Sequence, residues 1–265
     1  MVAKLTLSTC QAPNMDDLAR GLAGYLAEHL ALDVELDLNI SWQERERRLD
    51  AGELDLCWIC GLPYVVKAGR APGSIVPLVA PVMAGSRYQN RPIYFSDVVV
   101  HRDSPYLRLL DLEGAAWAYN EPGSQSGYGV VRYALALSGK TFDFFGEVVE
   151  SGAHQVSLEM ILAKEIDASA IDSTVLELEI AHRPEIAEHI RIIDTFGPSP
   201  IPPWVVTRRV PVEMRGALRV TMLGMQADPQ GKAILQSIGM ARFEAVTDRD
   251  YDPIREMARI AAISG

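Results

Sequence analysis

A short polar loop, Asn120-Glu121-Pro122-Gly123-Ser124-Gln125-Ser126-Gly127-Tyr128, joins a predicted apolar strand at 115–119 to a helix that continues to Leu135. Small residues at a helix start leave several backbone N–H groups without intrahelical partners, and the helix dipole adds partial positive charge at the same place. The loop therefore predicts an anion-binding site. Ser124 or Ser126 could equally be an ordinary N-cap, so the surrounding sequence has to decide between the two interpretations.

Strands and helices alternate on both sides of this loop. Helices with regularly spaced apolar residues, such as Leu18, Leu22 and Leu26, lie between most of the strands. This alternation is typical of α/β proteins whose mostly parallel sheets are flanked by helices. The predicted strands lie at 4–8, 34–38, 54–59, 75–80, 93–101, 115–119, 147–150, 166–171, 190–194 and 204–207.

The chain organisation predicts two lobes. A proline-rich segment at 196–203 interrupts the alternation, and after the strand at 204–207 only helices are expected, at 211–223, 228–238 and 252–260. Helices without strands of their own must pack on an existing sheet, so we expect them to return to the first lobe. The prediction is lobe 1 from 1–99 and 205–265 and lobe 2 from 100–204, with two hinge strands and a ligand cleft between the lobes.

Composition limits the function classes. The chain has 265 residues and a formal net charge of −10, which argues against nucleic acid as a partner but leaves room for a small anion held at short range. No apolar run is long enough to cross a membrane. The first residues lack the pattern of a secretory leader, so the chain is expected to be cytoplasmic or to have lost a leader.

The three cysteines, Cys10, Cys57 and Cys60, cannot form a disulfide framework. Cys57 and Cys60 have the spacing of a redox or zinc motif, yet the sequence offers neither a second pair nor a nearby histidine cluster. Buried small apolar residues are the prediction here, and no metal or cofactor is expected.

Ligands of open α/β sheets lie beyond the carboxyl ends of the strands, so the residues that follow each strand are candidates. His154 begins a predicted helix, where a neutral ring could donate to an anion or simply cap the surface. Asp172 either caps the next helix or faces the cleft, and Tyr94 lies on the crossing strand. Further candidates to line the site are Cys10, Gln11, Cys60, Gly61, Tyr128, Thr174 and Trp204.

Ser126, His154 and Asp172 also have the residue types of a nucleophilic triad. Gln125, however, stands where the nucleophile elbow of a hydrolase needs its serine. We therefore interpret the three residue types as a coincidence rather than as a hydrolase signature.

Several motifs in order make the chain resemble the phosphonate-type periplasmic solute-binding proteins of ABC importers, which have the type II binding-protein fold. They are Asp111-Leu112-Glu113-Gly114, Ala116-Trp117-Ala118-Tyr119, Ser124-Gln125-Ser126-Gly127, Ser151-Gly152-Ala153-His154 and Ile166-Asp167-Ala168. The resemblance implies an oxyanion cradle from Ser124, Ser126, Gly127 and the Gln125 backbone. It also implies that His154 and Tyr94 complete the ligand's shell.

The chain departs from this family at three places. Gln125 replaces the usual threonine, and Thr174 and Pro203 or Trp204 stand where aminoalkyl-phosphonate binders place carboxylates for the ligand's ammonium group. A buried ammonium without a partner is costly, so an aminoalkyl phosphonate is expected to bind poorly unless Asp172 compensates.

The first functional hypothesis is a periplasmic solute-binding protein, not an enzyme, that captures a small oxyanion such as phosphonate, phosphite, phosphate or a phosphate ester. Its partner would be an ABC permease, and Asp172 would accept a hydrogen bond from a protonated ligand oxygen. One alternative is a cytosolic lyase or hydrolase of the same fold that acts on a small carboxylate, with His154 or Asp172 as acid or base. The other is a ligand-sensing regulatory module.

Overall fold

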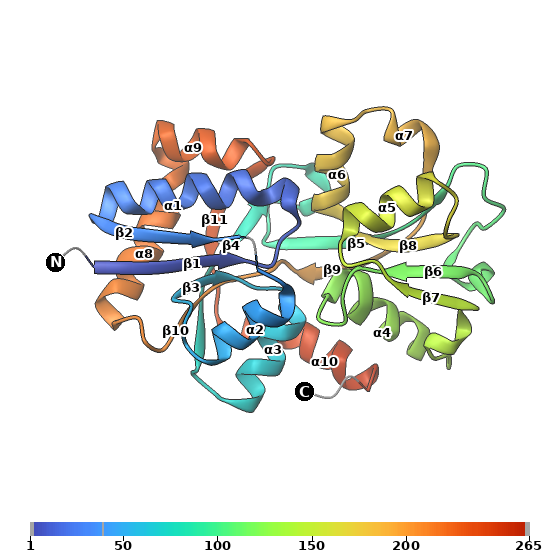
Figure 1. Ribbon diagram of the computed structural model, residues 1–265, viewed down its shortest axis with the longest axis horizontal. Helices are drawn as coiled ribbons and strands as arrows, with labels where there is room; N and C mark the ends of the chain where they lie inside the picture. The colour runs from blue at the N-terminus through green and yellow to red at the C-terminus, as the bar shows by residue number, and fades with distance from the viewer. Residues whose placement is uncertain (1–2, 39, 263–265) are drawn as a thin grey trace. The chain divides into compact units, whose positions relative to one another are not determined.

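The computed structural model describes residues 3–38 and 40–262, which form two compact units (Figure 1). The first unit contains the described residues up to Ile93 together with Pro200–Asp252, and the second contains Tyr94–Ser199 and the described residues from Pro253 on. The chain therefore leaves the first unit at Tyr94, returns at Pro200 and ends its described part in the second unit.

The first unit is built on a mixed sheet with the strand order β11-β4-β10-β3-β1-β2. β1 pairs in parallel with β2 and β3, whereas β10 is antiparallel to β3 and β4, and β11 is antiparallel to β4. The strands are β1 (Ala3–Thr9), β2 (Leu32–Asp37), β3 (Leu56–Trp58), β4 (Ile75–Met83), β10 (Trp204–Thr207) and β11 (Met240–Ala245).

Helices cover both faces of this sheet. α1 and α9 lie on one side, where α8 contacts α1, and α2 and α3 lie on the other (Figure 1). α1 buries Leu18, Leu22 and Leu26 completely because its apolar residues recur with the helical period. The helices are α1 (Asp16–Leu30), α2 (Trp42–Asp50), α3 (Gly61–Arg70), α8 (Val212–Gly224) and α9 (Pro229–Gln236).

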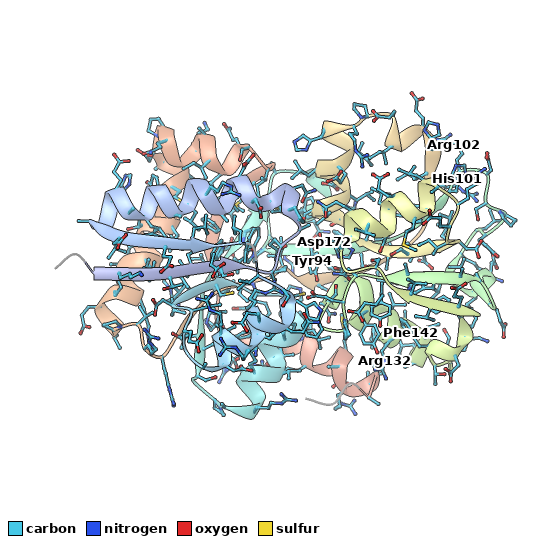
Figure 2. All side chains as sticks on the ribbon, viewed as in Figure 1. Tyr94, His101, Arg102, Arg132, Phe142 and Asp172 are labelled. Atoms are coloured by element: carbon cyan, nitrogen blue, oxygen red, sulfur yellow. The ribbon has the colours of Figure 1, made fainter. Side chains whose placement is uncertain are left out.

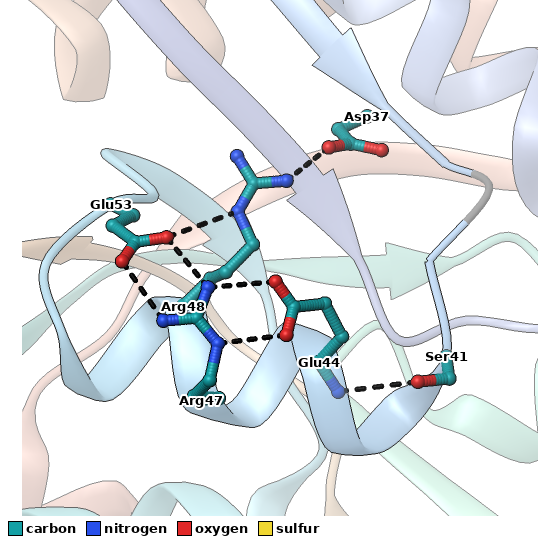
Figure 3. Close-up of polar contacts among 6 residues, drawn as sticks. All are labelled: Asp37, Ser41, Glu44, Arg47, Arg48 and Glu53. Carbon is teal, nitrogen blue, oxygen red and sulfur yellow. Dashed lines mark hydrogen bonds and ion pairs between the residues drawn. The ribbon is translucent and has the colours of Figure 1, made fainter.

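Polar contacts fix α2, a helix with few apolar residues, at both of its ends (Figure 3). The Ser41 hydroxyl caps the helix by accepting from Glu44 N at 3.3 Å. Arg47 binds Glu44 and Glu53, and Arg48 binds Asp37 and Glu53. Exposed ion pairs of this kind contribute little one by one, but together they join α2 to β2 and to the turn before β3.

The second unit has the sheet order β7-β6-β8-β5-β9. β6 runs parallel to β7 and β8, and β5 is antiparallel to β8. Its strands are β5 (Ile93–His101), β6 (Ala116–Tyr119), β7 (Glu147–Glu150), β8 (Ala168–Asp172) and β9 (Ile190–Pro200). Its helices are α4 (Val130–Leu137), α5 (His154–Leu162), α6 (Ser173–His182), α7 (Ile186–His189) and α10 (Asp252–Ile260).

Two apolar clusters cover the faces of this second sheet. On one face Trp117, with none of its surface exposed, packs with α4 residues such as Val131 and stacks on Phe145 at a ring distance of 4.5 Å. On the other face Leu158 of α5 and Leu176 of α6 pack against the sheet. The strand ends that carry the polar residues are thus held between two packed layers.

The structure differs from the sequence-based prediction at four places. Both sheets are mixed rather than mostly parallel, because β10, β11 and β5 pair antiparallel with their neighbours. β11 lies between the helices predicted at 228–238 and 252–260, where no strand was expected, and its burial does not alternate regularly. The segment at 196–203 was predicted to break regular structure, but β9 continues through Pro200.

The fourth difference concerns α10, which belongs to the second unit and not to the first. Its residue Met257 packs against the apolar cluster around Trp117. Within the described residues, none of the helices combines the length and the apolarity that a membrane crossing requires.

Candidate functional site

The polar loop after β6 opens a wide helical turn. Residues Gln125–Gly129 form one turn of π-helix, in which Gly129 N donates to the Ser124 carbonyl at 2.8 Å. The Ser124 hydroxyl caps this turn by accepting from Gly127 N at 2.9 Å. Single π turns are rare and are frequently found at functional sites. The predicted N-cap is therefore present at Ser124, and anion binding by the loop stays a prediction.

Gly127 allows two side chains to approach the loop closely. A Cβ at this position would lie 2.0 Å from Asn120 Oδ1 and 3.2 Å from His154 Cε1. Both distances are shorter than ordinary van der Waals contacts, so the absence of a side chain at Gly127 is a packing requirement.

His154 begins α5 and joins the loop through its ring. Its Nε2 lies 3.0 Å from Ser126 Oγ, and only 6% of the residue is exposed. Burial lowers the pKa of His154 to about 4, because a charged imidazolium would lose its hydration. The ring is therefore neutral near pH 7, as the sequence suggested for a histidine at a helix start.

Asp172 is the last residue of β8 and caps α6. Its Oδ1 accepts from Thr174 N at 2.8 Å and from Thr174 Oγ1 at 2.7 Å. Burial raises the pKa of Asp172 to about 6, although the hydrogen bonds from Thr174 partly offset this effect. The predicted cap is therefore present, with Thr174 as its partner, and a role of Asp172 toward the ligand stays a prediction.

Sheet register places further side chains beside the loop. Ser96 of β5 lies opposite Asp172, and its hydroxyl donates to the Ser126 carbonyl at 2.6 Å. Side chains two positions apart on a strand share a face, so Tyr94 lies on the face of Ser96. Figure 2 shows Tyr94 and Asp172 in the second unit, and both are almost completely buried.

The Gln125 side chain reaches α10. Its Nε2 donates to Met257 Sδ of α10 at 3.3 Å, and only 1% of Gln125 is exposed. Sequence reasoning assigned Gln125 to the cradle through its backbone alone, and the contact with α10 had no local signal.

Tyr128 belongs to a partly exposed aromatic group. Its ring contacts those of Tyr119 and Phe142, at centroid distances of 5.0 and 5.1 Å. The Arg132 guanidinium lies 5.5 Å from the Tyr128 ring centroid and donates to its hydroxyl. Figure 2 marks Arg132 and Phe142 within this group.

The remaining lining candidates lie in the first unit. Trp204 is fully buried and stacks on Trp58 at a ring distance of 5.4 Å. Gln11 donates to Cys10 Sγ at 3.4 Å, and Cys60 immediately precedes α3, which Gly61 begins. Their roles as ligand-lining residues stay predictions.

Cys57 has the character of a buried apolar residue. It is completely buried, and this burial raises the pKa of its thiol to about 12. Among the described residues, no group of three or more His, Cys, Asp or Glu side chains could hold a metal ion.

The three residue types of a triad are not arranged as one. Ser126 is within hydrogen-bond distance of His154, but within the described part of the chain His154 Nδ1 has no hydrogen-bond partner. Asp172 therefore does not orient the ring as the acid of a triad would.

The buried groups Asp172 and His154 have opposite effects on the pH dependence of stability. Between pH 6 and about 4 the folded chain holds a proton on Asp172, whose ordinary pKa is 3.8, that the unfolded chain has lost. Protonation of Asp172 therefore increases the free energy of unfolding as the pH falls. Between pH 6.5 and about 4 the unfolded chain holds a proton on His154 that the folded chain excludes, which opposes folding as the pH falls.

We expect these two effects to cancel in the native protein and to separate in variants. Relative to the native protein, Asp172→Asn should lose about 3 kcal/mol of unfolding free energy as the pH falls from 7 to 4, whereas His154→Gln should gain about 3 kcal/mol. Urea denaturation across this pH range measures both differences. Parallel profiles for the two variants would contradict the opposed pKa shifts.

The sequence comparisons agree on one kind of protein. A family described as "ABC transporter, phosphonate, periplasmic substrate-binding protein" matches residues 6–251. The phosphonates-binding periplasmic protein of Escherichia coli strain K12 is 24% identical over 218 residues, which cover 80% of this chain and 62% of that protein. The chain thus spans about 62% of this relative's length.

Solved structures share the fold at low sequence identity. A binding-protein component of a phosphonate ABC transporter from Pseudomonas aeruginosa has a TM-score of 0.87 at 17% identity and covers 99% of this chain and 87% of its own. PhnD1 of Prochlorococcus marinus, solved with methylphosphonate, has a TM-score of 0.84 at 18% identity and covers 97% of both chains. The aliphatic sulphonate-binding protein SsuA of Escherichia coli has a TM-score of 0.63 at 14% identity and covers 98% of this chain and 87% of its own. These likenesses confirm the predicted α/β architecture of type II binding proteins.

Proposed function

The chain belongs to the family of periplasmic substrate-binding proteins of phosphonate ABC transporters, and from this membership we propose that it captures a small oxyanion for an ABC importer. The ligand class comprises phosphonate, phosphite, phosphate and phosphate esters. The observation that carries the proposal is the contact of 3.0 Å between Ser126 Oγ and His154 Nε2, beside a capped turn that opens a helix.

The chemistry of the loop suits an anion that is not fully ionised. Ser124, Ser126 and the neutral ring of His154 offer dipoles without formal charge, which hold an anion at short range. Asp172 adds a carboxyl group on the sheet face of Ser96, which itself bonds to the loop. A carboxylate repels a dianion but accepts from a protonated oxygen, so it favours the singly protonated ligand.

The cellular setting follows from the family rather than from the site. We propose a periplasmic location and an ABC permease as the partner that receives the ligand, as the family description implies. The described residues of the cradle are a binding arrangement without a nucleophilic triad, which supports capture rather than turnover of the ligand.

The first test is calorimetry with methylphosphonate, phosphite, phosphate and 2-aminoethylphosphonate. We expect at least one of the first three compounds to bind tightly. 2-Aminoethylphosphonate should bind at least about 100-fold more weakly than that compound, because its ammonium group would lack a buried carboxylate partner. The Asp172 carboxyl is already engaged by two hydrogen bonds from Thr174, which its rotation toward an ammonium would break.

Acetate serves as the control ligand, since a site for small carboxylates would bind it in preference to the phosphorus oxyanions. Submicromolar affinity for 2-aminoethylphosphonate would overturn the specificity argument. Absence of binding to every phosphorus oxyanion would overturn the proposed function.

A further inference from the structure

The ring of His154 has one nitrogen engaged and one open. Nε2 lies 3.0 Å from Ser126 Oγ, whereas Nδ1 is buried and has no hydrogen-bond partner within the described part of the chain. A neutral imidazole carries its proton on only one nitrogen, so whichever group satisfies Nδ1 decides whether Nε2 donates or accepts.

Asn120 has the complementary open atom. Its Oδ1 is buried and lacks a hydrogen-bond partner among the described residues. The same Oδ1 and the Cε1 of His154 border the space above Gly127, at 2.0 and 3.2 Å from the position of a Cβ there. Cε1 is bonded to both ring nitrogens, so the amide oxygen and this end of the ring border the same space. Nε2 is already engaged by Ser126, which leaves Nδ1 as the open nitrogen.

Backbone hydrogen bonds hold Asn120 close to the segment that leads into His154. The Asn120 carbonyl accepts from Gly152 N at 2.9 Å, and the Tyr119 carbonyl accepts from Ser151 N at 2.8 Å. The segment that leads into α5 and His154 is therefore fixed to the first residue of the loop, so the open atoms stay close. A buried donor or acceptor without a partner is costly, and one water between the buried acceptor and the buried ring nitrogen would remove both costs.

We propose that one buried water links the Nδ1–H group of His154 to Asn120 Oδ1, and that this link makes Ser126 the acceptor for a protonated oxygen of the ligand. With the proton on Nδ1, Nε2 must accept, and the Ser126 hydroxyl donates its only proton to Nε2. The remaining lone pairs of Ser126 Oγ then select a ligand O–H group. Asn120 is in this scheme a positioning residue that acts through His154.

The inference rests on the proposed function and narrows its ligand class. A phosphonate or phosphate monoanion carries one P–OH group and matches the acceptor. A sulfonate anion of the same shape has no proton to offer, and its oxygens would face the lone pairs of Ser126. The site is therefore built for singly protonated phosphorus oxyanions and against sulfonates.

Nitrogen-15 NMR of histidine-labelled protein tests the positioning role without any ligand, because the two ring nitrogens have distinct shifts in each tautomer. His154→Gln assigns the signals. We expect the Nδ1–H tautomer in the native protein and in Asn120→Asp, which keeps an acceptor oxygen, and a mixture of tautomers in Asn120→Ala. Ser138→Ala, a change at the exposed residue that follows α4, is the matched control and should leave the spectrum unchanged.

Calorimetry tests the ligand class with the same variants. We expect methylphosphonate to bind the native protein at least about tenfold more tightly than methanesulfonate, and Asn120→Ala to lose about tenfold in methylphosphonate affinity. An Nε2–H tautomer in the native protein, or an unchanged tautomer and affinity in Asn120→Ala, would overturn the positioning role. If Asn120 set the tautomer but the native protein bound no phosphorus oxyanion, the proposed function would fail together with the ligand class.

Discussion

Gly127→Val is expected to abolish measurable binding of the oxyanion ligand. Even one added carbon would lie 2.0 Å from Asn120 Oδ1 and 3.2 Å from His154 Cε1, and valine adds two more. Because both neighbours are buried, the loop has to move away from His154, and the contact between Ser126 and the ring is lost. We expect an affinity loss of more than about 1,000-fold, since a displaced cradle loses several charge-assisted hydrogen bonds together.

Gly123 supplies the matched control in the same loop. A Cβ at Gly123 would meet only a Glu121 side-chain oxygen at 3.7 Å, an ordinary contact. Gly123→Val should therefore bind methylphosphonate within a few-fold of the native protein. Calorimetry gives the affinities, and circular dichroism shows whether both variants fold. Equal affinities for the two valine variants would mean that the loop around Gly127 is not the ligand site.

Replacing Ser126 and His154 together with alanine should weaken oxyanion binding by about 1,000-fold while the chain still folds. Hydrogen bonds to a charged ligand contribute about 1.5–3 kcal/mol each, and the double change removes the Ser126 hydroxyl together with the ring that orients it. The double change should cost less than the sum of the single changes, because the two side chains contact each other at 3.0 Å.

A double-mutant cycle with calorimetry measures this coupling directly. Ser138→Ala should change nothing, because the Ser138 hydroxyl is exposed just after α4 and donates to the Ala134 carbonyl. Thermal unfolding of each variant separates loss of the site from loss of the fold. Affinity that survives both alanine changes would place the ligand elsewhere on the protein.

Much of the candidate site could be predicted from local sequence. Ser124, Ser126 and Gly127 stand out because they are small residues in the loop between an apolar strand and a helix. His154 stands out because it begins α5. Signals of this kind depend on residues within one turn or one strand, which is the range that periodicity and capping rules describe.

Long-range packing explains what sequence reasoning missed. The position of α10 depends on Met257 meeting the cluster around Trp117, and nothing near residue 257 in the sequence specifies that partner. β11 forms because β4 offers it an edge, although its own burial pattern is irregular. No local sequence pattern indicates a role for Asn120, because the closeness of its Oδ1 to Gly127 depends on the folded loop.

The hydrogen bond from Gln125 to Met257 joins residues that are 132 positions apart, and the chain between them builds part of the other unit. During synthesis, Tyr94–Ser199 leaves the ribosome before Pro200–Asp252, and α10 follows both. The sheet of the second unit can form early, but the helix that braces its polar loop arrives only after the first unit's own returning strands. Assembly of a competent loop is thereby delayed until nearly all of the described chain has been made.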